Sequence, residues 1–208
     1  MPKSAKKLRS NPAWIERHIN DPFVKRSKVE GYRARSAYKL LELNEKEKLF
    51  RPGITVVDLG SAPGSWTQVA RSKMVNVAGK FSGHLVAMDI LPMEPVPDAV
   101  FLQGDFREQE VADQLSALLA DGKVDVVLSD MAPNLSGIPA VDAAASLLLN
   151  ELALEFALEH LCENGVLVVK AFQGSGYSQF IETVKRHFKS VAQRKPEASR
   201  DTSPEMYV

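Results

Sequence analysis

The chain has 208 residues, of which 45% are hydrophobic, and its 26 Lys and Arg residues are balanced by 26 Asp and Glu residues. This length and composition predict one globular domain with a hydrophobic core. No apolar run approaches the ~18 residues of a membrane span, the basic start lacks the apolar core of a signal peptide, and the single cysteine, Cys162, excludes an internal disulfide and a cysteine-built metal cluster.

These exclusions lead us to expect a cytoplasmic protein with no metal site and no membrane partner. Charge is distributed unevenly along it. Residues 1–40 contain 11 basic and 3 acidic residues, a net charge of +8, whereas residues 41–208 contain 15 basic and 23 acidic residues, a net charge of −8. A basic arm on an acidic body favours a polyanionic partner such as RNA, bound more weakly as salt rises. The alternative is a solvated tail that aids solubility.

The first third of the chain predicts a disordered start and two helices. Residues 1–10 carry no periodic pattern, and a short helix is expected at 11–19, with Asn11 as its cap and Pro12 in its first turn. A second helix is expected at 36–49 with Ser36 as its cap. Its apolar side is formed by Tyr38, Leu40, Leu41 and Leu43. A turn follows at 51–53.

Strands and helices then alternate to the end of the chain. Strands are expected at 54–59, 83–89, 99–102, 124–129 and 165–170, and helices at 64–77, 108–120, 140–162 and 176–188. Two more strands are expected at 190–196 and in "EMYV" (205–208). The first five strands are continuously apolar, which is typical of a parallel sheet covered on both faces. The pattern predicts an α/β fold with a doubly wound, mostly parallel, seven-stranded sheet.

Four of these apolar strands end at or near a charge. The charged residues are Asp58, Asp89, Asp130 and Lys170. Ligands of open parallel sheets bind beyond the carboxyl ends of the strands, so we expect these side chains to converge on one site. The alternative is that each charge only marks where its strand reaches the surface.

The loop "DLGSAPGSW" (58–66) joins the first strand to its helix. Gly60 permits a tight turn, and Gly64 lets the backbone approach a ligand at the helix N-terminus. The loop matches neither the dinucleotide-binding pattern nor a P-loop. Asp58 would repel a phosphate, so a ligand with positive charge, such as S-adenosylmethionine, fits better. Asp89 is placed to accept hydrogen bonds from ribose hydroxyls. Asp105 could accept from an adenine amino group or cap a helix at 106–119.

Six segments follow one another along the chain: "VVDLGSAPGSW", "DILPMEP", "FLQGDF", "SDMAPNLSG", "VVKAFQG" and "KPEASRDTSPEMYV". Together they resemble the FtsJ/RrmJ family of RNA 2′-O-ribose methyltransferases over residues 12–208. The resemblance implies a Rossmann-like methyltransferase fold that uses S-adenosylmethionine, with a basic N-terminal segment at 1–35 and the methyltransferase domain at 36–208. Its cofactor contacts would fall on Gly64, Trp66, Asp89, Asp105 and Asp130. Ser65 stands where the family often has glycine, which is tolerable only if Ser65 needs no positive φ.

The resemblance also implies a catalytic tetrad, formed by Lys39, Asp130, Lys170 and Glu205. Lys170 would take the hydroxyl proton as a neutral amine or stabilise the developing alkoxide as an ammonium. Asp130 would orient Lys170, while Lys39 and Glu205 would hold the ribose. Without the tetrad, Lys39 reads as a surface lysine of a helix and Glu205 as a charge on an edge strand. Trp66 could stack on the cofactor or a base, although a ring in a first helical turn is more often packed, which leaves its backbone N–H as the contact.

The segment "GYRARSAYK" interleaves aromatic and basic side chains, so Arg33 and Arg35 are predicted to contact RNA. We expect their loss to weaken RNA binding without affecting cofactor affinity. Among RNA substrates, the short chain favours the bacterial type that methylates a uridine in 23S rRNA of the large ribosomal subunit, acting as a monomer. The alternatives are tRNA or an mRNA cap, a nicotinamide oxidoreductase, which the missing G-x-G-x-x-G disfavours, and a non-catalytic ribosome-assembly factor.

Overall fold

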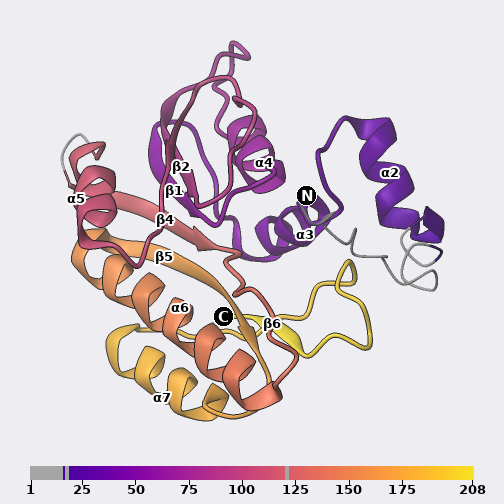
Figure 1. Ribbon diagram of the computed structural model, residues 1–208. Helices are drawn as coiled ribbons and strands as arrows, with labels where there is room; N and C mark the ends of the chain where they lie inside the picture. The colour runs from indigo at the N-terminus through magenta and orange to yellow at the C-terminus, as the bar shows by residue number, and fades with distance from the viewer. Residues whose placement is uncertain (1–15, 17–18, 120–121) are drawn as a thin grey trace, which may run out of the picture.

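The computed structural model describes residue 16 and residues 19–119 and 122–208. The predicted disordered start and almost all of the predicted helix at 11–19, with its cap Asn11 and Pro12, lie outside the described residues. The described chain forms a six-stranded sheet in the order β3-β2-β1-β4-β5-β6, with helices on both sides (Figure 1). The strands are β1 (Ile54–Leu59), β2 (Gly83–Asp89), β3 (Ala99–Gln103), β4 (Val124–Ser129), β5 (Leu161–Phe172) and β6 (Glu205–Tyr207).

Among the described strands, β1 to β5 pair in parallel with one another, and β6 pairs antiparallel with β5. Strand order therefore reverses between β1 and β4, and the carboxyl ends of the parallel strands meet at one edge of the sheet. The predicted α/β, doubly wound architecture is confirmed. The described helices are α2 (Pro22–Glu30), α3 (Ala37–Glu47), α4 (Ser65–Lys73), α5 (Gln109–Ala117), α6 (Pro139–His160) and α7 (Tyr177–His187).

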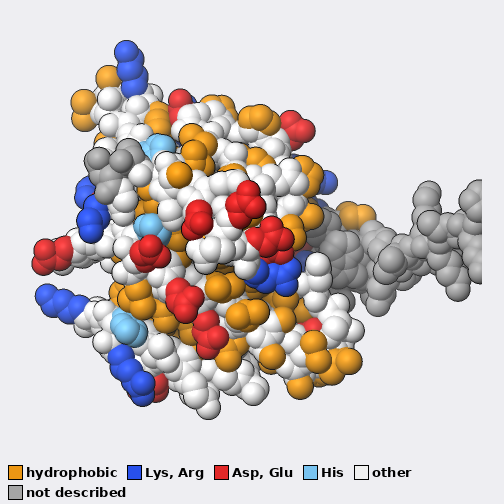
Figure 2. Space-filling view, turned by 60° about the vertical axis from the view of Figure 1, so that its left-hand side comes forward, with side chains coloured by type: hydrophobic (Ala, Val, Ile, Leu, Met, Phe, Trp, Pro, Cys, Tyr) orange, Lys and Arg blue, Asp and Glu red, His pale blue; other side chains and the backbone are white. Residues whose placement is uncertain are grey.

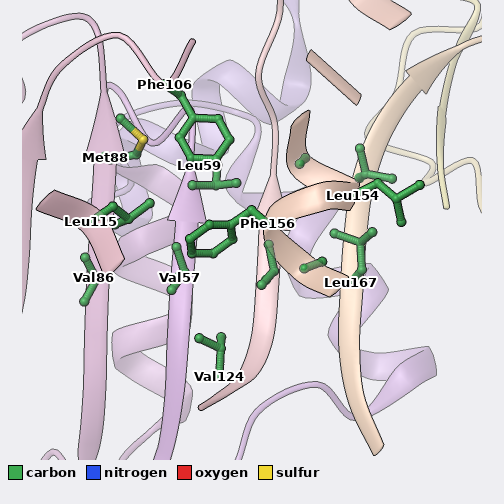
Figure 3. Close-up of a cluster of buried hydrophobic side chains, with 14 of the residues drawn as sticks. Val57, Leu59, Val86, Met88, Phe106, Leu115, Val124, Leu154, Phe156 and Leu167 are labelled. Carbon is green, nitrogen blue, oxygen red and sulfur yellow. The ribbon is translucent and has the colours of Figure 1, made fainter. Parts of the chain in front are cut away.

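Alternate residues of the same strands point into two separate cores. Val57 and Leu59 of β1 pack with side chains of α5, α6 and α7, including Leu115 and Phe156 (Figure 3). Val56 faces the opposite side, where α3 and α4 supply the packing. The four β1 and α5 side chains named here have no exposed surface, and Phe156 of α6 is 5% exposed. This two-sided burial is the reason the strands read as continuous apolar runs.

The expectation of seven strands is wrong by one for the described residues. Residues 190–196 do not form a strand and contribute only an isolated bridge between Arg194 and Tyr207. The segment has only two adjacent apolar side chains, Val191 and Ala192, apart from its terminal proline, and its one bridge is to a residue of the short β6. Strand β5 is longer than the predicted 165–170, because irregular pairing with β4 continues it back to Leu161.

The helix α2 was not expected, yet its ends carry clear signals. The carboxylate of Asp21 accepts from the backbone N–H groups of Phe23 and Val24 at 3.0 and 3.3 Å, Pro22 occupies the first turn, and Gly31 ends the helix at φ 79°. Asp-Pro at the start and Gly at the end are typical helix boundaries. Within the described part of the chain, none of the helices combines the length and apolar character needed to span a bilayer.

Candidate active site

The ends of β4 and β5 bring two of the strand-end charges into contact. Lys170 lies on β5, and its Nζ is 3.0 Å from Oδ1 of Asp130 and donates a 2.6 Å hydrogen bond to the carbonyl oxygen of the same residue. Asp130 follows β4, where its N–H donates to the carbonyl of Leu59 at 3.1 Å and so extends the β1–β4 ladder. The side chain of Lys170 is only 9% exposed, which makes this a largely desolvated ion pair.

A second ion pair joins the helix α3 to the last strand. Nζ of Lys39 lies 2.6 Å from Oε1 of Glu205, and both side chains are 12% exposed. Burial by itself raises the pKa of Glu205, but the charge and hydrogen bond of Lys39, with a contribution from Lys170, outweigh it and hold the pKa below its ordinary value. Glu205 is therefore an acceptor-only carboxylate near neutral pH, and neither Lys39 nor Glu205 is the isolated surface charge of the alternative interpretation.

Tyr207 connects the two ion pairs, and it was not among the site residues predicted from the sequence. Its hydroxyl donates to Oδ1 of Asp130 at 3.1 Å, and Nζ of Lys39 lies 5.7 Å from the centre of its ring. Burial, and then the negative charge of Asp130, raise the pKa of Tyr207 well above its usual value. The β5–β6 register explains the placement, because Tyr207 pairs with Lys170. A buried Tyr two residues after Glu205 shares its strand face, which is the signal that could have identified it.

Asp58 lies beneath the glycine loop rather than in contact with solvent. Its side chain has no exposed surface, its Oδ2 accepts a 2.7 Å hydrogen bond from Thr67, and its Oδ1 has no partner among the described residues. Burial, helped by the nearby carboxylates of Asp130 and Asp89, raises its pKa to about 7. The expectation that Asp58 touches a cofactor directly does not fit this burial. Its influence on a ligand would be electrostatic.

The carboxylate of Asp89 holds the loops that follow β1 and β2. Its Oδ2 accepts from the N–H of Ala62 and its Oδ1 from the N–H of Leu91, each at 2.8 Å. A carboxylate has about four acceptor positions, so capacity remains for ribose hydroxyls. Gly60 has φ 76°, and an added Cβ would lie 2.7 Å from Cγ of Met131. A larger residue at position 60 would therefore displace the segment that follows Asp130.

Two residues of the same loop show how α4 begins. Gly64 has φ 105°, a conformation that other residues rarely adopt. Ser65 is the first residue of α4 and does not have a positive φ, so the departure from the family's glycine costs no backbone strain. The indole of Trp66 is 2% exposed, donates to the carbonyl of Ser36 at 2.9 Å and packs against Tyr207. Its ring is therefore not available to stack on a ligand, and only its backbone remains for that role.

Asp105 is not a helix cap, contrary to one of its two predicted roles. The helix α5 begins four residues later, with Glu108 at its N-cap position. Asp105 instead accepts from the backbone N–H of Arg107 at 3.0 Å and pairs with its guanidinium. Hydrogen bonds from Arg107 lower the pKa of Asp105, so it is an ionised acceptor beyond β3.

Arg33 and Arg35 do not present free guanidinium groups. Arg33 donates to three backbone carbonyl oxygens, of Pro63, Glu94 and Pro95. Arg35 pairs with Asp21 and donates to the carbonyl of Ala198. Both side chains hold the N-terminal segment onto the sheet domain, a role that was not predicted from the sequence. Interleaved Arg and Tyr residues predict an RNA-contacting surface from sequence, but they do not reveal such internal acceptors.

The charges at this edge of the sheet suit a ligand that combines positive charge with hydroxyl groups. Asp58, Asp89 and Asp130 lie close enough for mutual repulsion to contribute to the raised pKa of Asp58. A cation bound nearby would relieve that repulsion. S-adenosylmethionine carries an ammonium, a sulfonium and a ribose, so these residues fit it. Among the described residues no group of three or more His, Cys, Asp or Glu side chains could hold a metal ion.

Comparisons with known proteins agree with this geometry. Residues 32–208 match the model of the FtsJ-like methyltransferase family. The chain is 55% identical to the ribosomal RNA large subunit methyltransferase E of Cupriavidus necator, covering 97% of this chain and 95% of that one, and 55% identical to the protein of the same name from Bordetella pertussis, covering 94% and 93%. A crystal structure from Plasmodium falciparum, assigned as a ribosomal RNA methyltransferase, superposes with a TM-score of 0.73 at 29% identity, covering 85% of this chain and 95% of that one.

Proposed function

The chain belongs to the FtsJ-like methyltransferase family, and we propose that it methylates a ribose 2′-hydroxyl of large-subunit ribosomal RNA with S-adenosylmethionine as the donor. The proposal is supported by relatives that carry that substrate in their name and align with almost the whole chain. Within that substrate we propose a uridine of 23S rRNA in the large ribosomal subunit, and a monomeric, cytoplasmic enzyme. We also propose that residues 1–35 form an RNA-contacting segment and residues 36–208 the methyltransferase domain.

Methyl transfer to a hydroxyl is an in-line displacement, so the protein must align the attacking oxygen and stabilise its developing charge. When bound, S-adenosylmethionine supplies a methyl group activated by its sulfonium. Lys170 is suited to the oxygen, because as an ammonium it contacts Oδ1 of Asp130, donates to the carbonyl oxygen of the same residue and keeps a third N–H for the ribose. We therefore assign Lys170 the role of the charged stabiliser, with the hydroxyl proton released to water.

The remaining groups position Lys170 and the sugar. Asp130 holds the ammonium, and Tyr207 holds Asp130 from the other side. The Lys39–Glu205 pair offers an ionised acceptor and a cation beside them, suited to a ribose with adjacent hydroxyls. The single observation that carries the proposal is the contact between Lys170 and Asp130, at the same sheet edge as the glycine loop and Asp89.

The surface charges suggest how RNA approaches. Lys25 and Lys28 on α2 are exposed, on the same segment as the basic N-terminal residues. The face around α5 and α6 carries a group of acidic side chains among hydrophobic ones, with most of the visible Lys and Arg side chains toward its margins (Figure 2). Its exposed carboxylates include Glu110 and Asp113 on α5 and Glu151 on α6. RNA phosphates would be repelled there, so we propose that RNA lies on the side of α2 and the tetrad.

The test is methyl transfer from labelled S-adenosylmethionine to ribosomal subunits from cells that lack the enzyme, followed by mapping of the methylated ribose. Lys170→Ala should lower the single-turnover rate by roughly 10²–10³-fold or more, with cofactor binding retained. Lys185→Ala is the matched control, because Lys185 forms an exposed pair with Glu182 on α7. Transfer by Lys170→Ala at the wild-type rate would show the assignment to be wrong.

Lys170→Arg separates the two chemical roles of the lysine. Arginine keeps the positive charge but does not deprotonate in proteins. A charged stabiliser predicts that Lys170→Arg transfers methyl groups faster than Lys170→Ala. A neutral base predicts that both variants are equally inactive.

A further inference from the structure

Arg33 joins the two loops that flank the cofactor site. Its Nη1 donates to the carbonyl oxygen of Pro63 at 3.0 Å and to that of Glu94 at 2.6 Å, and its Nη2 donates to that of Pro95 at 2.8 Å. Pro63 belongs to the glycine loop after β1, while Glu94 and Pro95 belong to the loop after β2. One planar guanidinium therefore fixes the separation of two loops that follow adjacent strands.

The backbone that carries Arg33 is itself held in place. The side-chain amide of Gln68, on α4, accepts from the N–H of Arg33 at 3.0 Å and donates to the carbonyl of Gly31 at 3.1 Å. Gly31 is the residue that ends α2. The segment 31–33 is thus fastened to α4 from both ends, which directs the side chain of Arg33 toward the loops rather than toward solvent.

The same guanidinium also lies against the glycine that begins α4. A Cβ added to Gly64 would come within 2.6 Å of Nη1 of Arg33 and 2.9 Å of Sδ of Met93. Asp89 forms a second connection between the loops, through the N–H groups of Ala62 and Leu91. Arg33 and Asp89 therefore join the same two loops, one as the donor to carbonyl oxygens and the other as the acceptor from N–H groups.

We propose that Arg33 is a positioning residue for S-adenosylmethionine binding, and not primarily a ligand of RNA phosphates. By holding Pro63 near Glu94 and Pro95, it sets the distance between the loop expected at the methionine end of the cofactor and the loop beyond Asp89 expected at its ribose. This inference rests on the proposed function, because it assumes that the cofactor lies between these loops. It also connects the N-terminal RNA-contacting segment to the cofactor site through a single side chain.

A lysine could not replace this connection. Its ammonium is a single point of donation, whereas the guanidinium reaches three carbonyl oxygens through two nitrogens of a rigid fork. Charge is retained in Arg33→Lys, so the variant separates the geometry of the fork from its charge. An RNA-phosphate contact, in contrast, would tolerate lysine well.

The experiment measures the affinity of wild type, Arg33→Ala and Arg33→Lys for S-adenosylhomocysteine by calorimetry, and their RNA affinity as a function of salt. We expect both variants to lose roughly tenfold or more in cofactor affinity, as expected when a positioning contact is removed. We also expect KM for the donor to rise more than kcat falls, with the salt dependence of RNA binding unchanged. Arg71→Ala is the matched control, because Arg71 ties α4 to Asp98 in the same loop through an exposed pair and should change cofactor affinity by less than about twofold.

Two results would overturn the proposal. One is unchanged cofactor affinity in Arg33→Lys, which decides the question even if Arg33→Ala fails to fold. The other is weaker RNA binding with a smaller salt dependence and normal cofactor affinity, which would make Arg33 the phosphate ligand that the sequence suggested. If wild type itself failed to bind S-adenosylhomocysteine, the proposed function would be at fault rather than the role of Arg33.

Discussion

Replacing Asp58 by asparagine should change how the stability of the protein depends on pH. Asp58 is fully buried, and burial with the charges of Asp130 and Asp89 raises its pKa to about 7. The unfolded chain releases this proton near pH 4, as an ordinary aspartate does. The folded state therefore binds the proton more tightly than the unfolded state. Asp58 contributes stability that is complete below the unfolded pKa and is lost as pH rises through about 7.

The magnitude follows from the same shift. Between about pH 5.5 and pH 8, titration of this residue should lower the free energy of unfolding of wild type by about 2 kcal/mol. The lower pH lies about 1.5 pH units below the folded pKa, and each pH unit is worth about 1.4 kcal/mol. Asp58→Asn has no charge to titrate, so its stability relative to wild type should improve by about 2 kcal/mol over that interval. The cost of burying an amide beside Thr67 is the same at both pH values and cancels in the difference.

Urea denaturation of both proteins at the two pH values measures this difference. Asp113→Asn is the matched control, because Asp113 is an exposed acid on α5. We expect its relative stability to change by less than about 0.5 kcal/mol over the same interval. A stability difference between Asp58→Asn and wild type that is the same at both pH values would refute the raised pKa of Asp58, and so would a variant that becomes relatively less stable at the higher pH.

Three further predictions concern the site and the N-terminal segment packed beside it. Tyr207→Phe removes a hydrogen bond to Asp130 and should slow single-turnover methyl transfer by roughly ten- to a hundredfold, with unchanged S-adenosylhomocysteine affinity. An unaltered rate would contradict the role of Tyr207 in positioning Asp130. Asp21→Ala removes the cap of α2 and the partner of Arg35, so chemical denaturation should show a free energy of unfolding lower by about 2–3 kcal/mol. A decrease of less than about 0.5 kcal/mol would mean that these contacts do not stabilise the protein. Gly64→Ala places a Cβ at φ 105° and against Arg33, so calorimetry should show roughly tenfold weaker S-adenosylhomocysteine binding. Wild-type affinity would argue against a close approach of the cofactor to the backbone at Gly64.

The sheet could be predicted because its strands are buried on both faces. Val56 and Val57 are adjacent and both fully buried, one in each core, so the run "ITVV" is apolar throughout and its end at Asp58 is unambiguous. The helix α2 carried its signals at Asp21, Pro22 and Gly31, but its apolar pattern is weak and only Val24 and Ser27 are buried. The segment 190–196 resembles a strand in composition, but the sequence does not show whether a neighbouring strand is available for it to pair with.

The site was predictable as a set of residue types and not as a set of contacts. Lys39, Asp130, Lys170 and Glu205 were identified, and the structure brings them together as two ion pairs. Their connection through Tyr207 depends on the β5–β6 register, which involves pairing across a long stretch of chain. The internal acceptors of Arg33 are backbone carbonyls, and a carbonyl leaves no mark on a sequence.

The antiparallel β6 has a consequence for when the enzyme becomes active during its synthesis. Lys39 leaves the ribosome early, and the parallel strands can assemble as they emerge, yet Glu205 and Tyr207 reach their partners only when β6 docks beside β5. Because contacts distant in sequence form late and domains fold from the N-terminus during translation, a nascent chain would have an incomplete constellation of charges. Methylation by a protein still tethered to the ribosome that makes it would therefore be disfavoured until almost all of this sequence has been translated.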